Sequence, residues 1–145
     1  MKQTHETIRN WYRSHGRTGL PWRTTDDPYR IYLSEVMLQQ TQVKTVLERY
    51  YFPFLEKFPT LKTLGEAPLD NVLKMWEGLG YYNRAKNLHS TAQILLQRGK
   101  AQNIAPALPC EIDALLKLPG IGKNTAHAVA AFAFRQPVPV MEANV

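Results

Sequence analysis

Residues 118–126 are Leu118-Pro119-Gly120-Ile121-Gly122-Lys123-Asn124-Thr125-Ala126, the most specific local signal in this chain of 145 residues. The proline and two glycines lie close together and predict a tight turn, because glycine adopts positive φ and lets another backbone approach closely. Apolar residues recur at helical spacing on both sides of the turn. The stretch therefore predicts a helix–hairpin–helix at about residues 111–134.

A hairpin of this kind can bind the DNA backbone. The first amides of its second helix have no acceptor within the helix and can donate to a phosphate oxygen, and Lys123 adds a positive charge beside them. Such contacts grip DNA without reading its sequence. The alternative for the same residues is an ordinary turn with glycine caps. The residues expected to contact DNA are Leu118, Gly120, Gly122, Lys123, Asn124 and Thr125.

Helical periodicity also dominates the rest of the chain. The clearest amphipathic segment is 42–58, which Pro53 is expected to kink or divide. Further helices are predicted at 4–15, from Pro28 behind an Asp27 N-cap, from Pro68, at 82–98 before Gly99, at 111–118 and at 124–134. No pair of strands is indicated. The sequence predicts an all-α protein with six or seven helices.

Composition sets limits on the partners and the compartment. The net charge of +6, from 18 Lys and Arg against 12 Asp and Glu, permits a polyanionic partner without proving one. Cys110 is the single cysteine, so this chain alone cannot form a disulfide, a cysteine zinc site or an iron–sulfur cluster. Residues 1–6 have no apolar core of signal-peptide type, and no apolar run approaches the length of a membrane span. We expect a cytoplasmic protein with no membrane partner and no metal site.

Glu35 is the first candidate for chemistry. It lies among large apolar side chains, which would disfavour its charged form, raise its pKa and let it donate a proton to a leaving group. A solvent-facing glutamate is the plainer alternative. Gln39, Gln40 and Gln42 follow; their amides can bond base edges or enter a base stack, or can simply cover a polar helix face.

Two further segments carry candidate side chains. Gly78 to Ala85 contains two glycines and then Tyr81 and Tyr82, and an aromatic ring at a backbone bend can insert between bases. Paired tyrosines packed in a core explain the pattern equally well. Glu142 is a second acid that could face Glu35 across a pocket and support cleavage through a cationic sugar, or could belong to a frayed end.

Taken in order, these segments resemble the MutY-type adenine DNA glycosylases of the helix–hairpin–helix superfamily. The motifs that carry the resemblance, between about Leu20 and Val145, are Leu20–Arg23, Ser34–Val43, Gly78–Leu88 and Leu118–Ala126. The resemblance implies a six-helix barrel module over 20–145, and it implies that 1–19 is the N-terminal helix of an incomplete cluster module.

The resemblance also implies an activity. Glu35 would be the general acid that protonates adenine flipped from a duplex where it opposes 8-oxoguanine or guanine. Gln40 and Tyr81 match positions that enter the base stack, and Asn144 matches a pocket residue. The implied protein is a monomeric, monofunctional base excision repair glycosylase that binds double-stranded DNA in a bacterial cytoplasm, at the nucleoid.

Three departures from the family pattern matter. Glu142 and Ala143 stand where the family has an aspartate that stabilises the sugar cation and a glycine. The family's four cluster cysteines and its C-terminal domain have no counterpart, so we expect a truncated chain that ligates no cluster, is less stable and leaves Trp11 and Tyr12 exposed. Asn124 stands where the endonuclease III class has a nucleophilic lysine.

Two alternatives to an active adenine glycosylase therefore remain. The first is a DNA-binding module without catalysis, motivated by Glu142 and by the expected truncation. The second is a pyrimidine-lesion glycosylase of the endonuclease III type, against which Asn124 and the glutamine-rich run 39–42 both weigh.

Overall fold

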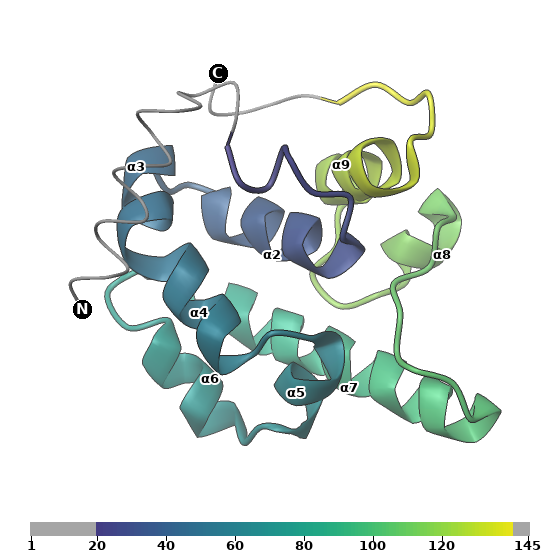
Figure 1. Ribbon diagram of the computed structural model, residues 1–145, viewed down its shortest axis with the longest axis horizontal. Coiled ribbons are helices and arrows are strands. Elements are labelled where there is room, and N and C mark those ends of the chain that lie inside the picture. The colour runs from purple at the N-terminus through teal and green to yellow at the C-terminus, as the bar shows by residue number, and fades with distance from the viewer. Residues whose placement is uncertain (1–19, 141–145) are drawn as a thin grey trace.

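The computed structural model describes residues 20–140, and every regular element within that range is helical (Figure 1). The elements are α2 (Pro28–Leu38), α3 (Val43–Thr45), the π-helical turn η1 (Val46–Tyr50), α4 (Tyr51–Lys57), α5 (Leu61–Glu66), α6 (Leu69–Met75), α7 (Tyr82–Gln102), α8 (Ile112–Leu116) and α9 (Lys123–Phe134). The all-α prediction is confirmed. The expectations for helix 4–15, Trp11, Tyr12, Glu142 and Asn144 lie outside the described residues. Between residues 20 and 140, no helix is long and apolar enough to cross a membrane.

Helix α2 runs through the middle of the fold and contacts α4, α7 and α9 (Figure 1). It begins as predicted, because the Asp27 carboxylate accepts a hydrogen bond of 3.0 Å from the Tyr29 amide and proline occupies the first helical position. Ile31, Leu33 and Met37 are completely buried. A helix covered on several sides is held in a fixed position, so side chains on it are accurately placed.

The segment 42–58 is not the single helix divided at Pro53 that its periodicity predicts. The break comes earlier, where the Tyr51 amide donates to the Val46 carbonyl five residues back and closes a π-helical turn. Pro53 then lies in the first turn of α4, where its missing N–H leaves no helical hydrogen bond unmade. The division keeps Val46, Tyr51 and Phe54 buried.

Two other boundaries differ from the prediction. Helix α5 was missed, although Thr60 and Thr63 form a reciprocal capping box at its start. Helix α7 continues past Gly99, which is not a stop signal here: a Cβ at Gly99 would lie 2.6 Å from the Ile104 carbonyl oxygen. The glycine admits the returning backbone, and α7 ends instead at Gln102, with Asn103 as its C-cap at φ of 57°.

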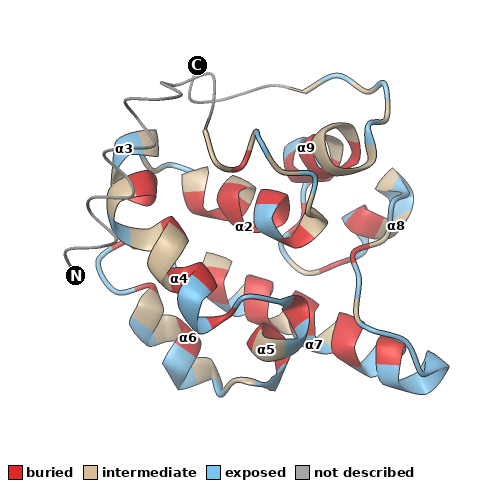
Figure 2. Cartoon of the chain, viewed as in Figure 1, coloured by how far each residue is buried: buried red, intermediate tan, exposed pale blue. Residues whose placement is uncertain are grey.

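The core consists of apolar side chains on the inward faces of the helices (Figure 2). Two aromatic pairs contribute to it: the ring centres of Trp22 and Tyr51 lie 5.0 Å apart, and those of Phe54 and Trp76 lie 6.0 Å apart, both edge to face. These contacts fix two loops, the one that carries Trp22 and the one that follows Trp76. Both loops carry candidate site residues.

Candidate functional site

Glu35 is neither solvent-facing nor enclosed only by apolar groups. Its side chain is 20% exposed, and Ser34 and Val36 on either side are buried. The Glu35 Oε1 atom lies 3.2 Å from Nη2 of Arg23, which forms a hydrogen-bonded ion pair with it. The carboxylate is therefore fixed in direction by a charged partner that the spacing of residues along α2 could not reveal.

Arg23 connects Glu35 to α9. Its guanidinium carbon lies 3.9 Å from the centre of the Phe132 ring, within the range of a cation–π contact. Its backbone amide donates to the Leu20 carbonyl at 2.8 Å, and the neighbouring Trp22 is 1% exposed. The loop 20–27 is thus anchored beside Arg23, and the guanidinium is held between Glu35 of α2 and Phe132 of α9.

The glutamines at the end of α2 have separate positions. Gln39 donates from Nε2 to the Thr125 hydroxyl at 3.2 Å, which ties the end of α2 to the first turn of α9. Gln40 is exposed and has φ of 58°, a left-handed conformation that is uncommon for a residue other than glycine. Gln42 is exposed and precedes α3.

The bend between α6 and α7 places two tyrosines at the surface. Gly78 and Gly80 have φ of 86° and 82°, and Tyr81 has φ of 49°. A Cβ at Gly78 would lie 2.7 Å from the Tyr50 hydroxyl, which itself donates to the Glu77 carbonyl at 2.8 Å. Tyr81 is 62% exposed and Tyr82 is 43% exposed, so the alternative that this pair packs in the core is wrong.

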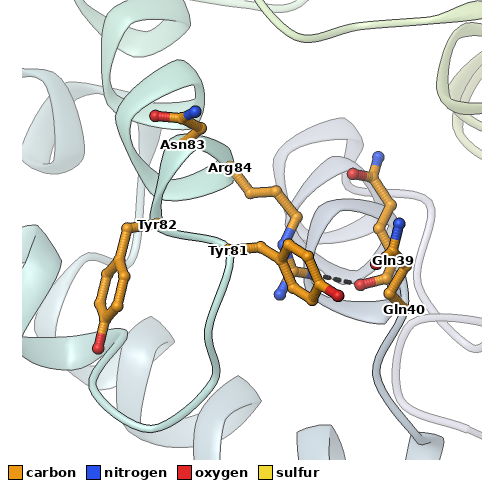
Figure 3. Close-up of a pocket in the computed structure, with 6 residues that line it drawn as sticks. All are labelled: Gln39, Gln40, Tyr81, Tyr82, Asn83 and Arg84. Atoms are coloured by element: carbon orange, nitrogen blue, oxygen red, sulfur yellow. Dashed lines mark hydrogen bonds between the residues drawn. The ribbon is translucent and has the colours of Figure 1, made fainter.

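A pocket of about 350 Å³ lies between the end of α2 and the start of α7 (Figure 3). Tyr81 points across it toward Gln40, whereas Tyr82 points away. Gln40 and Tyr81 thus share one pocket and one kind of strained backbone. Strain of this kind costs about 1–3 kcal/mol per residue and collects at functional sites. The residues that line the pocket are Gln39, Gln40, Tyr81, Tyr82, Asn83 and Arg84.

Arg84 also lines this pocket, and the predictions from sequence give it no role. Its Nη2 atom lies 3.2 Å from the Gly80 carbonyl, and its Nη1 atom lies within hydrogen-bond distance of carbonyls at the end of α2. Burial lowers the pKa of the Arg84 guanidinium, and the nearby Tyr81 raises it. The only signal in the sequence is a basic residue three positions after Tyr81.

The two glycines of the hairpin between α8 and α9 have different roles. Gly120 has φ of 72°, and a Cβ there would lie 2.7 Å from Cβ of Asn87 on α7, so the fold itself requires glycine. Gly122 is the N-cap of α9 in an extended conformation, and a Cβ there would have no atom within 4 Å. Packing does not account for glycine at 122, which leaves open space in front of the first α9 amides.

The other predicted hairpin residues divide by exposure. Lys123 and Asn124 are exposed beside Gly122. Leu118 and Thr125 are only 3% and 5% exposed, so their side chains face the protein rather than solvent. Helix α9 starts at Lys123, one residue before the predicted start. The amides of its first three residues have no acceptor within this twelve-residue helix.

Cysteine is too scarce in this chain to hold the iron–sulfur cluster of the family that it resembles. A four-iron, four-sulfur cluster needs four thiolates, and this chain has the single Cys110, which is exposed. Within residues 20–140, no three His, Cys, Asp or Glu side chains are grouped as metal ligands. The residues of this chain do not fit such a cluster.

Comparison with known proteins agrees with this geometry. Residues 33–145 match the HhH-GPD superfamily of base excision DNA repair proteins. The adenine DNA glycosylase of Buchnera aphidicola subsp. Baizongia pistaciae is 48% identical over 97% of this chain and 38% of its own length; that of Mycolicibacterium smegmatis is 42% identical over 94% and 44%. The chain thus spans less than half of these relatives. A thermostable thymine-DNA glycosylase structure superimposes with a TM-score of 0.76, at 29% identity, over 99% of this chain and 63% of its own.

Proposed function

The chain belongs to the HhH-GPD superfamily of base excision DNA repair proteins, and on that premise we propose that it is a monofunctional adenine DNA glycosylase. Its substrate is adenine opposite 8-oxoguanine or guanine in double-stranded DNA. One observation carries the proposal: α2 carries Glu35, ends two residues before Gln40, and packs against the hairpin helix α9. A proton donor, a stack-entering residue and a DNA anchor therefore share one rigid support.

Glu35 is the proton donor in this proposal. Protonation of the adenine ring lets the bond between the base and C1′ break with its electrons leaving on the base, and water then adds to the cationic sugar. The ion pair at 3.2 Å with Arg23 must open or be shared as adenine enters. Arg23 then remains beside the carboxylate through its contact with Phe132 and limits the directions it can take.

Gln40 and Tyr81 support the extrusion of the target base. Chemistry on a stacked base requires that the base leave the duplex, and the space it vacates must be filled. Two exposed side chains on left-handed backbone, at opposite sides of one pocket, suit this task. Insertion of a ring or an amide into the stack offsets part of the cost of unstacking.

The hairpin supplies the anchor. Phosphate oxygens can approach the α9 amides through the open space at Gly122, with Lys123 alongside. Asn124 cannot form a Schiff base, and Lys123 is rotated about 100° from it around the helix, which supports a glycosylase without strand-cleaving activity. Contacts from the Leu118 and Thr125 positions would come from their backbones.

Glu142 and Asn144 complete the proposed adenine-binding site around Glu35. Glu142 would stabilise the sugar cation in place of aspartate, with its carboxylate displaced by roughly an ångström, which costs on the order of a hundredfold in rate where geometry is tight. The His127 ring lies 2.9 Å from the Pro139 carbonyl and ties the segment before these residues to α9. The protein acts as a monomer at the bacterial nucleoid, and its own chain ligates no cluster.

The role of Glu35 is tested under single-turnover conditions. Protein in excess is incubated with duplex containing adenine opposite 8-oxoguanine, and abasic sites are cleaved with alkali. Glu35→Gln keeps the shape but cannot donate an acidic proton, so release should be abolished, whereas Glu56→Gln on the exposed face of α4 should release adenine at the wild-type rate. Release by the Glu35→Gln protein would refute the assignment.

DNA binding without base release is the second candidate. It is favoured by Gly122, whose open space requires neither Glu35 nor Glu142. It predicts binding that weakens with salt and on Lys123→Ala, with no abasic product from any duplex. Failure to bind duplex at low salt eliminates it. Strand nicking at an oxidised pyrimidine, trapped by borohydride, would instead indicate the endonuclease III class.

A further inference from the structure

The Arg84 guanidinium binds two separate backbone segments. On one side, Nη1 lies 2.8 Å and 3.1 Å from the carbonyl oxygens of Val36 and Met37, and it also bonds the carbonyl of Gln39. These carbonyls lie at the end of α2 or just beyond it, where the helix dipole is negative. On the other side, Nη2 lies 3.2 Å from the carbonyl of Gly80.

The same guanidinium also contacts two aromatic rings. Its central carbon lies 5.5 Å from the ring centre of buried Trp76 and 5.5 Å from that of Tyr81, which is 62% exposed. Both distances fall within the cation–π range. Trp76 in turn donates from Nε1 to the Gly80 carbonyl at 3.0 Å. The Tyr81 ring therefore packs against the Arg84 guanidinium, which the buried Trp76 ring contacts as well.

Both segments that Arg84 joins are strained at the residue next to the bond. Gln40, with φ of 58°, follows the bonded carbonyl of Gln39, and Tyr81, with φ of 49°, follows that of Gly80. Left-handed backbone persists outside glycine only where its surroundings hold it. A forked, planar guanidinium can bind in two directions at once, whereas a lysine ammonium is a single point charge.

We propose that Arg84 is a positioning residue that sets the backbone of Gln40 and Tyr81 before DNA binds, so that both side chains enter the base stack together. The inference rests on the proposed function, because it assumes that these residues open a duplex. Arg84 acts only through them. Its loss should impair opening of the stack far more than duplex affinity, which the hairpin provides separately.

The experiment compares three variants with the wild type. Arg84→Gln removes the charge and the fork, Arg84→Lys keeps the charge alone, and Arg98→Gln removes a charge from an exposed position of the same helix. The probe is 2-aminopurine beside an adenine that opposes 8-oxoguanine, and its fluorescence rises when the stack opens. Readings are taken at saturating protein, so that affinity, measured separately by anisotropy, does not enter.

The expected result is a fluorescence rise for the wild type and Arg98→Gln, a rise at least about fivefold smaller for Arg84→Gln, and an intermediate value for Arg84→Lys. Duplex affinity of the Arg84 variants should stay within about threefold of the wild type. Circular dichroism verifies folding; if Arg84→Gln fails to fold, Arg84→Lys carries the test. A full rise in the folded Arg84 variants, or none in the wild type, overturns the inference.

A second substrate separates positioning from general damage. Adenine opposite an abasic site has no partner base, so less stacking must be opened. Adenine release by Arg84→Gln should fall about ten- to a hundredfold on the 8-oxoguanine duplex and clearly less on the duplex with the abasic site. Equal losses on the two duplexes overturn the inference. No release by the wild type, with the fluorescence pattern intact, would defeat the proposed function and leave Arg84 its role.

Discussion

At the scale of single residues, buried hydroxyl groups give the sharpest contrast. The Tyr29 hydroxyl donates to the Phe58 carbonyl at 2.6 Å, whereas the Tyr51 hydroxyl is buried and has no hydrogen-bond partner among residues 20–140. An unmet buried polar group costs about 1–3 kcal/mol. The Tyr29 hydroxyl therefore stabilises the fold, whereas the Tyr51 hydroxyl destabilises it.

This contrast predicts the effects of two matched substitutions. Tyr29→Phe orphans the Phe58 carbonyl and should lower the free energy of unfolding by about 1–3 kcal/mol, and Tyr51→Phe should leave it unchanged or raise it. Urea unfolding followed by circular dichroism measures both. A loss in Tyr51→Phe as large as that in Tyr29→Phe would show that the Tyr51 hydroxyl is satisfied.

At the scale of elements, the hairpin predicts different outcomes for its two glycines. Gly120→Ala places a side chain on left-handed backbone and against Asn87, so the free energy of unfolding should fall by on the order of 2–3 kcal/mol. Gly122→Ala meets no atom and has permitted dihedral angles, so stability should change by less than about 0.5 kcal/mol.

Gly122→Ala should weaken DNA binding although it leaves stability nearly unchanged. Its methyl group would stand in front of the α9 amides and should weaken duplex binding on the order of tenfold, or ~1.4 kcal/mol. Anisotropy titration at low salt, with Lys100→Ala at the far end of α7 as the charge control, measures this. Wild-type affinity in Gly122→Ala would remove the hairpin from the interface.

The elements also show what could be predicted from sequence. Asp27-Pro28 and the residues around Gly120 predict helix starts and a turn because their signals are local. Gly99 misled because its small size serves a distant backbone, at residues 104–106, rather than a helix end. Arg23 and Arg84 were missed for the same reason: Arg23 pairs with Glu35, 12 positions away, and Arg84 binds the Val36 carbonyl, 48 positions away, so no local spacing indicates these contacts.

At the scale of the whole molecule, buried tyrosines link stability to alkaline pH. Burial raises the pKa of Tyr32 and of Tyr51 to about 12, from an ordinary value of 10. Because the folded pKa is the higher one, this stabilisation is complete below pH 10 and is lost as pH rises through about 12. The free energy of unfolding should fall between those values.

Urea midpoints at pH 9, 10, 11 and about 12 measure this decline. Tyr32→Phe should make the curve shallower, since one of the groups that ionise on unfolding is removed. Tyr82→Phe, at an exposed position, serves as the control and should leave the slope unchanged. A flat profile in the wild type would show that the tyrosines ionise freely in the folded protein.

The central claim is that this chain releases adenine, and the most direct measurement compares wild type and Glu142→Asp on duplex with adenine opposite 8-oxoguanine. Protein is used in excess and alkali-labile sites are counted over time. The account predicts slow release by the wild type and faster release, by up to about a hundredfold, when aspartate restores the shorter reach. No release by either protein, while both bind the duplex, would contradict it and leave DNA binding as the function.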